Sequence, residues 1–344
     1  MTVDHLANAT LLAVDQYFDL YDDRVDDDFR LPDNLPPAVL PRDGLALCGV
    51  LRSASKLTGR STPLGIALRS GELDKLTLNM PQGVREPFVA TQHDLEWVFP
   101  KAYDEDVREA LDPLEQIVSL ATAMQAFPAD WSKGRTRAIG ADWVGATRLP
   151  WSNLAVRQIN QCRPPLEVAE SSAHGLAWLR WLATRILPFP TFLLSDVRVA
   201  ALLGVTPLSL KGTLASSGSG VANQLRACIF EGPLSGMQPR RFWRAGIIEL
   251  VESFVMSSDI TDSSEVGRTL VKLDGNLLAH EIDDPVVCID RDYRELDTIA
   301  SRDESQRLAP DGWPPYADPA WALSSSIESE GMDELLAPRA GFMR

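Results

Sequence analysis

The stretch DVRVAALLGVTPLSLKGTLA, residues 196–215, carries the most specific local signal in this 344-residue chain. Its first half places apolar side chains at helical spacing, and Gly204 follows where a helix can end in a left-handed conformation. Thr206 and Pro207 then favour a second helix, because threonine caps helix N-termini and proline suits the first helical position. The stretch therefore predicts two short helices joined by a tight turn.

The two predicted helices have distinct inner and outer faces. The side chains expected inside are Val199, Leu202, Leu203, Leu210 and Leu214. The residues expected to face outward are Leu208, Ser209, Lys211, Gly212 and Thr213. Such an outward face on the second helix is what a recognition helix offers to the major groove of DNA.

This order of helix, glycine-bearing turn and second helix resembles the helix-turn-helix superfamily of DNA-binding proteins, over residues 196–215 only. The resemblance implies contact with duplex DNA, and we assign to it Arg198, Thr206, Ser209, Lys211 and Thr213. Two features depart from the pattern: Lys211 is the only charged residue on the second helix, and Gly212 lowers helix propensity by about 1 kcal/mol relative to alanine. The alternative interpretation is a tri-helical packing unit in a structural or adaptor protein.

The charge distribution favours DNA binding even though the net charge is −15. Residues 133–244 hold 14 Lys+Arg against 5 Asp+Glu, whereas residues 1–132 hold 11 against 22 and residues 245–344 hold 8 against 21. A basic middle part that contains the helix pair suits a nucleic-acid contact. We expect the acidic flanks to bind protein partners.

A second basic feature is the sequence QPRRFWR, residues 238–244, at the start of a helix predicted over 239–256. Arginines in a first helical turn oppose the helix macrodipole, which favours acidic groups there. We expect Arg240, Arg241 and Arg244 to grip DNA phosphate together with the helix amides. The alternative is that they pair with acidic residues elsewhere in this acid-rich chain.

The remaining patterns predict a mainly α protein with a minor β component (α+β). Further helices are expected over 6–21, 104–126 and 165–187, and strands over 73–80, 268–273, 276–282 and 285–290, with a hairpin turn at Asp274-Gly275. Three domains follow from composition: an acidic mixed domain over 1–130, a basic helical domain over 131–257, and an acidic region with a hairpin and an irregular tail over 258–344.

Several classes of protein and site are disfavoured. Four widely spaced cysteines argue against a zinc site or a disulfide framework and suit a reducing cytoplasm. The chain shows no signal-peptide pattern and no apolar run of about 20 residues, so we expect a cytoplasmic protein without a membrane span.

No catalytic signature stands out, and the four histidines are scattered. We therefore expect no cofactor and assign no metal. Asp290 and Asp292 after a predicted strand leave a metal-dependent nuclease as a third interpretation, but an Asp-x-Asp pair alone has low specificity. The favoured function is a non-enzymatic DNA-binding protein, a regulatory or accessory subunit of a larger DNA-handling assembly.

Overall fold

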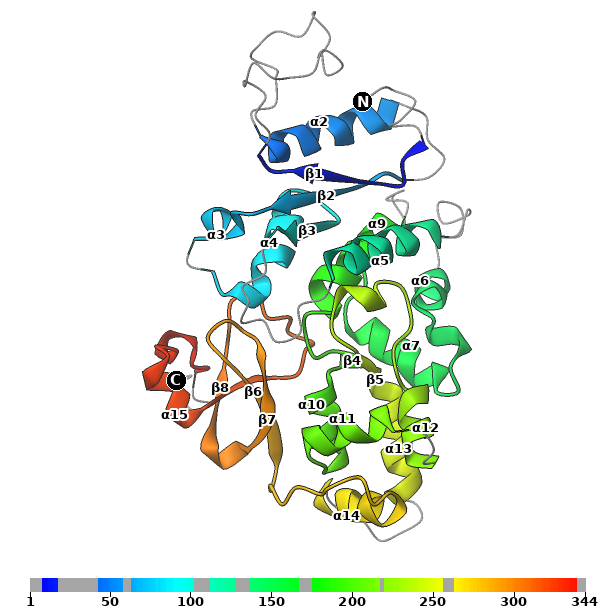
Figure 1. Ribbon diagram of the computed structural model, residues 1–344, viewed down its shortest axis with the longest axis vertical. Coiled ribbons are helices and arrows are strands. Elements are labelled where there is room, and N and C mark those ends of the chain that lie inside the picture. The colour runs from blue at the N-terminus through cyan, green and yellow to red at the C-terminus, as the bar shows by residue number, and fades with distance from the viewer. Residues whose placement is uncertain are drawn as a thin grey trace, which may run out of the picture. The chain divides into compact units, whose positions relative to one another are not determined.

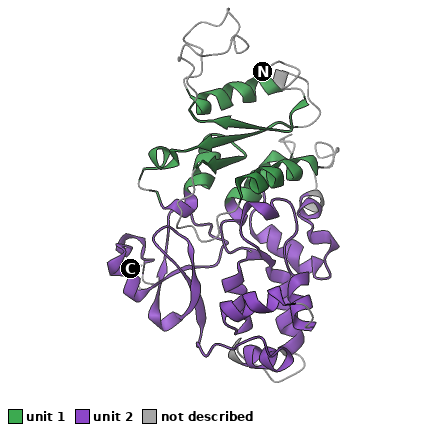
Figure 2. Ribbon diagram, in the orientation of Figure 1, with its two compact units in different colours: residues 1–80, 85–139, 165–184 green, residues 81–84, 140–164, 185–344 purple. Residues whose placement is uncertain are grey.

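The computed structural model describes residues 8–17, 43–57, 63–78, 80–101, 112–127, 137–166, 175–216, 220–255 and 263–338. About 51% helix and 17% strand confirm the predicted mixture of helices with a smaller β component. The chain divides into two units: unit 1 is residues 1–80, 85–139 and 165–184, and unit 2 is residues 81–84, 140–164 and 185–344 (Figure 2). The chain thus leaves unit 1 and returns to it, which differs from the three consecutive regions expected from charge.

Unit 1 contains a parallel sheet in the order β1-β2-β3 (Figure 1). The strands are β1 (Leu11–Asp15), β2 (Gly65–Ser70) and β3 (Trp97–Pro100). Its helices are α2 (Gly44–Leu57), α3 (Leu73–Leu76), α4 (Arg85–Gln92), α5 (Pro113–Gln125) and α9 (Leu176–Trp181). Helices between successive strands are what parallel pairing requires, because the chain must cross back before each new strand.

Two predictions in unit 1 were wrong. Of the helix expected over 6–21, the structure describes residues 8–17, and these contain β1 instead; the nearly continuous apolar sequence LLAV of β1 is typical of a strand in a parallel sheet. The strand expected over 73–80 is replaced by the short helix α3. In both cases the short apolar pattern fits the periodicity of a helix as well as that of a strand, and packing against the sheet decides between helix and strand.

A buried carboxylate ties three parts of unit 1 together. Glu96, whose side chain is fully buried, accepts hydrogen bonds from Arg180 Nη2 and Arg52 Nη2, both at 2.7 Å, and from the amide of Ile66. Asp94 also pairs with Arg180. These contacts link α2, the start of β3 and α9.

Unit 2 combines helices with short two-stranded sheets. Its helices are α7 (Ser152–Gln161), α10 (Asp196–Leu203), α11 (Pro207–Ala215), α12 (Gly220–Ala227), α13 (Arg244–Val255), α14 (Ser263–Leu273) and α15 (Ser324–Ser329). The antiparallel strand pairs are β4 (Leu193–Leu194) with β5 (Phe242–Trp243), β6 (Pro285–Ile289) with β7 (Glu295–Ser301), and β8 (Ser305–Leu308) with β9 (Ala320–Leu323). The helix α6 (Arg137–Val144) and a π-helix over Leu182–Ile186 span points where the chain passes between the units. Unit 2 also contains single 3-10 turns at Gln82–Val84, Ala146–Arg148, Ser235–Met237, Arg302–Glu304 and Asp333–Leu335.

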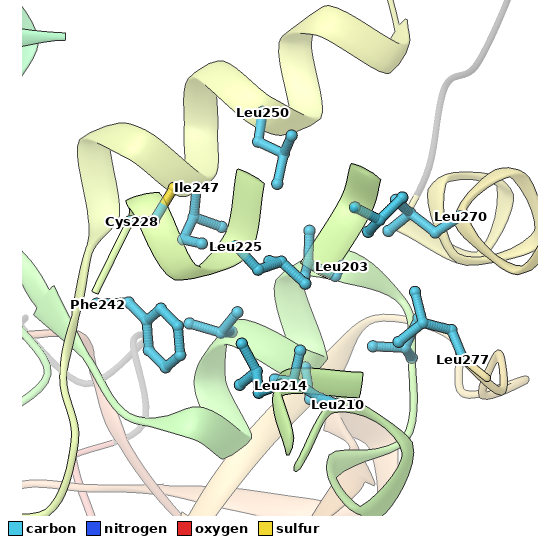
Figure 3. Packing of buried hydrophobic residues seen from close by; sticks show 14 of the residues in the cluster. Leu203, Leu210, Leu214, Leu225, Cys228, Phe242, Ile247, Leu250, Leu270 and Leu277 are labelled. Carbon is cyan, nitrogen blue, oxygen red and sulfur yellow. The ribbon is translucent and has the colours of Figure 1, made fainter. Parts of the chain in front are cut away.

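The main core of unit 2 lies among α10, α11, α12, α13 and α14. Figure 3 shows buried apolar side chains from these helices, from β5 and from the loops after α12 and α14 gathered in this core. Those that it labels are Leu203, Leu210, Leu214, Leu225, Cys228, Phe242, Ile247, Leu250, Leu270 and Leu277. Four of the five residues expected on the inner face of the helix pair are buried. The exception is Leu202, which is 40% exposed.

The predicted hairpin around Asp274-Gly275 was also wrong, because residues 263–273 form the helix α14. Val266 and Leu270 are buried one turn apart, while Arg268 and Lys272 are exposed, as in an amphipathic helix. Asp274 ends this helix: its side chain accepts a hydrogen bond from the amide of Asn276. The strand predicted over 285–290 is confirmed as β6.

The predicted helix boundaries needed adjustment elsewhere. The helix expected over 239–256 begins only at Arg244, after the strand β5. Of the helix expected over 165–187, the structure describes α9 and the π-helix, and residues 167–174 lie outside the described residues. The helix expected over 104–126 is described from Pro113, with Asp112 as its N-cap.

The turn between α10 and α11 is built on glycine. Gly204 has φ 67°, so it ends α10 in the left-handed conformation that glycine adopts without strain. Gly267 of α14 packs directly on it: a Cβ at Gly267 would lie 2.0 Å from the carbonyl oxygen of Gly204. Glycine at both positions therefore allows α14 to cover the turn.

Candidate functional site

The end of α10 and the start of α11 lie at the residues from which these boundaries were predicted. Thr206 is the N-cap of α11, and its hydroxyl accepts a hydrogen bond from the amide of Ser209 at 3.3 Å. Pro207 occupies the first helical position. Thr206 also donates its own amide to the carbonyl of Leu278 at 2.8 Å. Thr206 was predicted to contact DNA, but its polar groups instead cap α11 and bind the neighbouring loop.

The outer face of α11 differs from the one expected. Ser209 is only 7% exposed, and its hydroxyl donates to the carbonyl of Thr206 at 3.0 Å. Thr213 is completely buried. Leu208, Lys211 and Gly212 do reach the surface, and Lys211 Nζ lies 3.9 Å from the carboxylate of Asp297 on β7. The prediction that Ser209 and Thr213 face outward was wrong, because neighbouring segments of unit 2 cover that side of the helix.

The arginines predicted to bind phosphate gather with acidic side chains instead. Arg240 binds Asp196 at the start of α10, with Nη2 2.5 Å from Oδ2. Arg244 Nη2 lies 2.6 Å from Asp318 Oδ2. Arg198 pairs with both Glu295 and Asp318. This arrangement matches the alternative weighed above, in which acidic residues elsewhere in the chain satisfy the arginines.

Arg241 has a different environment from the other three. Its Nε donates to the carbonyl of Leu187 at 3.1 Å. Burial lowers the pKa of this guanidinium, an effect opposed by the charges of Glu295 and Asp196. Burial alone would raise the pKa of Glu295, but the charges of Arg198 and Arg241 outweigh it, so that pKa lies below its usual value. The cluster is therefore electrostatically coupled as a group.

We call these residues the arginine cluster: Arg198, Arg240, Arg241 and Arg244 with Asp196, Glu295 and Asp318. They come from α10, the β5 region, the start of α13, β7 and the loop before β9. The placement of the arginines in a first helical turn was wrong for Arg240 and Arg241, which precede α13. Only Arg244 is a residue of that helix.

The two aspartates considered as metal ligands have structural partners. Asp290 accepts hydrogen bonds from the amides of Asp292 and Arg294, at 2.8 and 2.9 Å. Asp292 accepts one from the amide of Gln82 at 2.9 Å. Burial raises the pKa of Asp290. The described residues contain no group of three or more side chains suited to hold a metal ion, so nothing here adds support to a metal-dependent nuclease.

Unit 1 has a polar cluster that sequence reasoning missed, at the carboxyl ends of its strands. Lys101, directly after β3, forms an ion pair with Asp15 at the end of β1. Ser70 at the end of β2 donates a hydrogen bond to Gln16, and both are buried. The sequence did contain a signal for this cluster, because each polar residue lies at the end of an apolar strand. The carboxyl ends of the strands form the edge at which α/β sheets commonly bind ligands. These side chains bind one another, and we assign no ligand to them.

Exposed leucines surround the α10–α11 turn. Leu208 on the first turn of α11 is 82% exposed, and Leu278 is 61% exposed. The carbonyl of Leu278 accepts hydrogen bonds from Thr206 and Ser209, so its loop lies against the start of α11. Leu202 of α10 and Leu273 at the end of α14 are also exposed, and these two helices pack against each other. We call Leu202, Leu208, Leu273 and Leu278 the leucine surface.

Comparison with known proteins identifies no relative. No family model matches the chain, and no curated protein and no solved structure matches it either. Among the described residues, no helix combines the length and the apolar character that crossing a membrane requires.

Proposed function

We propose that this chain is a structural or adaptor subunit that binds a partner protein through the leucine surface. The supporting observation is the exposure of large apolar side chains on contacting segments around one turn. Grouped apolar side chains on a protein surface mark interaction sites more often than single exposed ones do. In this proposal α10 and α11 form a packing unit, and the turn between them presents the binding surface.

The polar chemistry of the same region suits this proposal better than base recognition. A recognition helix needs several outward polar side chains to meet base edges in the major groove. The buried positions of Ser209 and Thr213 leave Lys211 as the polar side chain of α11 that reaches the surface. Leu208 lies one turn before it, and an apolar contact there favours a protein partner.

Site-specific photocrosslinking tests the adaptor function. With a benzophenone amino acid in place of Leu208, we expect a discrete protein adduct after irradiation in the native host, because this side chain would lie inside the interface. The matched control carries the same probe in place of Leu78, which is 76% exposed but belongs to unit 1. Equal adduct patterns at both positions, or no protein adduct from position 208, would exclude the leucine surface as the interface.

DNA binding remains a second candidate, supported by a different surface of unit 2. Within residues 140–164, Arg148, Arg157 and Arg163 are exposed, and Asp142 is the only acidic residue of that segment. Exposed guanidinium groups can contact phosphates without reading the base sequence. A DNA contact through this segment would depend on charge and not on the face of α11.

A salt series tests this second candidate. If these arginines contact phosphate, the double variant R157A/R163A should bind duplex DNA more weakly and flatten the salt dependence by about 0.9 units of slope per lost contact. Arg302→Ala provides the control, since Arg302 is an exposed arginine of the same unit that already pairs with Asp284. A mobility-shift assay at low ionic strength measures both quantities. Absence of a complex, or a complex indifferent to salt, argues against DNA binding.

A further inference from the structure

The loop that carries Leu278 is held on the α10–α11 turn by backbone hydrogen bonds. The amide of Thr206 donates to the carbonyl of Leu278 at 2.8 Å, and the amide of His280 donates to the carbonyl of Gly204 at 3.1 Å. An isolated antiparallel bridge lies between these two bonds. The position of this exposed leucine therefore depends on a short pairing between the loop and the turn.

The side chain of His280 holds the second half of the same loop. It is only 7% exposed, and its Nδ1 accepts a hydrogen bond from the amide of Ile282 at 3.2 Å. Because a ring nitrogen that accepts carries no proton, the proton of the neutral ring is on Nε2. Nε2 is buried too and has no hydrogen-bond partner of good geometry among the described residues. The contact with Ile282 thus requires an uncharged imidazole.

Protonation of His280 would break this contact. A proton on Nδ1 would meet the amide proton of Ile282, so that two donors would face each other in a buried place. Burial lowers the pKa of His280, and the backbone carbonyl of Ala201 on α10 opposes this effect. The native loop therefore favours the neutral ring.

The charged groups of the surrounding segments do not cause this shift of pKa. On α10, α11, α14 and the loop itself, these groups are Asp196, Arg198, Lys211, Glu265, Arg268, Lys272 and Glu281. Among the described residues, burial and the Ala201 carbonyl are the causes of the shift, and no charged side chain is one. The preference for the neutral ring thus comes from the packing of the loop on the turn.

We propose that His280 is a pH-sensitive switch of the leucine surface: the uncharged ring holds residues 278–282 on the α10–α11 turn, and its protonation releases them. Release takes Leu278 away from the start of α11, so the surface is complete at neutral pH and incomplete in mild acid. The effect on partner binding rests on the proposed adaptor function, whereas the release of the loop does not.

The direction of the pH effect follows from the lowered pKa of His280 in the attached loop. In the released loop the ring has the ordinary pKa of about 6.5, so below that pH the released state binds more protons than the attached state. The attached state is therefore favoured above about pH 6.5 and loses stability as the pH falls from there. At pH 5.5 a free imidazole is about ten-to-one protonated, which limits the increase in opening to about tenfold.

Hydrogen exchange of the full chain at pH 7.5 and pH 5.5 tests the switch. After correction for the intrinsic exchange rate at each pH, the amides of residues 206 and 280 should lose protection by up to about tenfold at pH 5.5. The amides of α13 should keep their protection, because the core of unit 2 stays folded. An equal loss in α13 would indicate general acid unfolding and would overturn the proposal, as would unchanged protection of the two loop contacts.

The variant His280→Asn separates the titration from the packing. Oδ1 of asparagine can accept from the Ile282 amide as Nδ1 does, but it does not titrate, so protection should be the same at both pH values. His93→Asn is the matched control, because His93 is exposed in unit 1, and it should keep the wild-type response. A wild-type response in His280→Asn would assign the effect to other groups and overturn the switch. If this variant does not fold, the wild-type exchange data decide by themselves.

Crosslinking from position 208 separates the switch from the adaptor function. In an extract of the native host, the adduct of the benzophenone probe at Leu208 should be weaker at pH 5.5 than at pH 7.5, and equally strong at both in the His280→Asn background. Equal adducts in the wild-type background would leave the adaptor function intact and overturn its regulation by His280. Absence of an adduct at both pH values would contradict the adaptor function, while hydrogen exchange would still decide whether the loop is released.

Discussion

Replacing Glu96 by alanine should destabilise unit 1 by about 3 kcal/mol, one of the two largest effects that we expect in this protein. The carboxylate is fully buried and binds the guanidinium groups of Arg52 and Arg180. Its removal leaves both cations in a partly buried site and takes the side-chain acceptor from the Ile66 amide. The expected value lies at the lower end for broken buried ion pairs, because both arginines retain some access to water.

Hydrogen exchange resolves this effect within one unit. The amides of β2 and β3 should lose protection by a factor of about 100 in Glu96→Ala, since 1.4 kcal/mol corresponds to about tenfold. Glu72→Ala is the control: Glu72 pairs with Lys75 at 2.5 Å, but both side chains are well exposed, and such pairs contribute little. Similar losses in the two variants would contradict the structural role of Glu96.

Replacing Leu203 by aspartate should unfold the helical core of unit 2, with a loss of about 4 kcal/mol or more. Leu203 is fully buried among the side chains shown in Figure 3. An unpaired carboxylate there lacks both water and a hydrogen-bond donor. The measurement is urea unfolding followed by circular dichroism, combined with hydrogen exchange of α10 and α13.

The adjacent leucine provides a matched control on the same helix. Leu202 is 40% exposed, so Leu202→Asp can keep its charge in water and should cost no more than about 1 kcal/mol. Lys211→Ala on α11 should likewise leave unit 2 folded. Comparable unfolding in Leu202→Asp and Leu203→Asp would show that the inner face of α10 has been assigned incorrectly.

The sequence predicted the local features whose causes lie within a few residues. Gly204, Thr206 and Pro207 mark the end of one helix and the start of the next, because αL conformation, capping and a fixed φ are properties of single residues. The same holds for the apolar strand β6. Short segments such as β1, α3 and α14 were predicted wrongly, because a few apolar residues fit two periods equally well.

The candidate sites depended on contacts that no local pattern contains. The sequence assigned Arg198 to a DNA contact and marked Arg240, Arg241 and Arg244 as an unusual group at a helix start, but it did not identify the acidic groups that surround them. Arg198 meets Glu295 and Asp318 from 97 and 120 residues away. The leucine surface likewise depends on Leu278 reaching α11 from a distant loop.

By itself, then, the amino-acid sequence determined the paired helices around Gly204, their caps and the basic character of the middle of the chain. Only the tertiary structure decided which face of α11 is buried, and that Ser209 and Thr213 lie on it. The physical reason is range: backbone preferences act over about one helical turn, whereas burial and charge pairing depend on every segment that packs nearby. For the same reason, only the folded chain shows that Glu295 and Asp196 lie close enough to Arg241 to act on its charge.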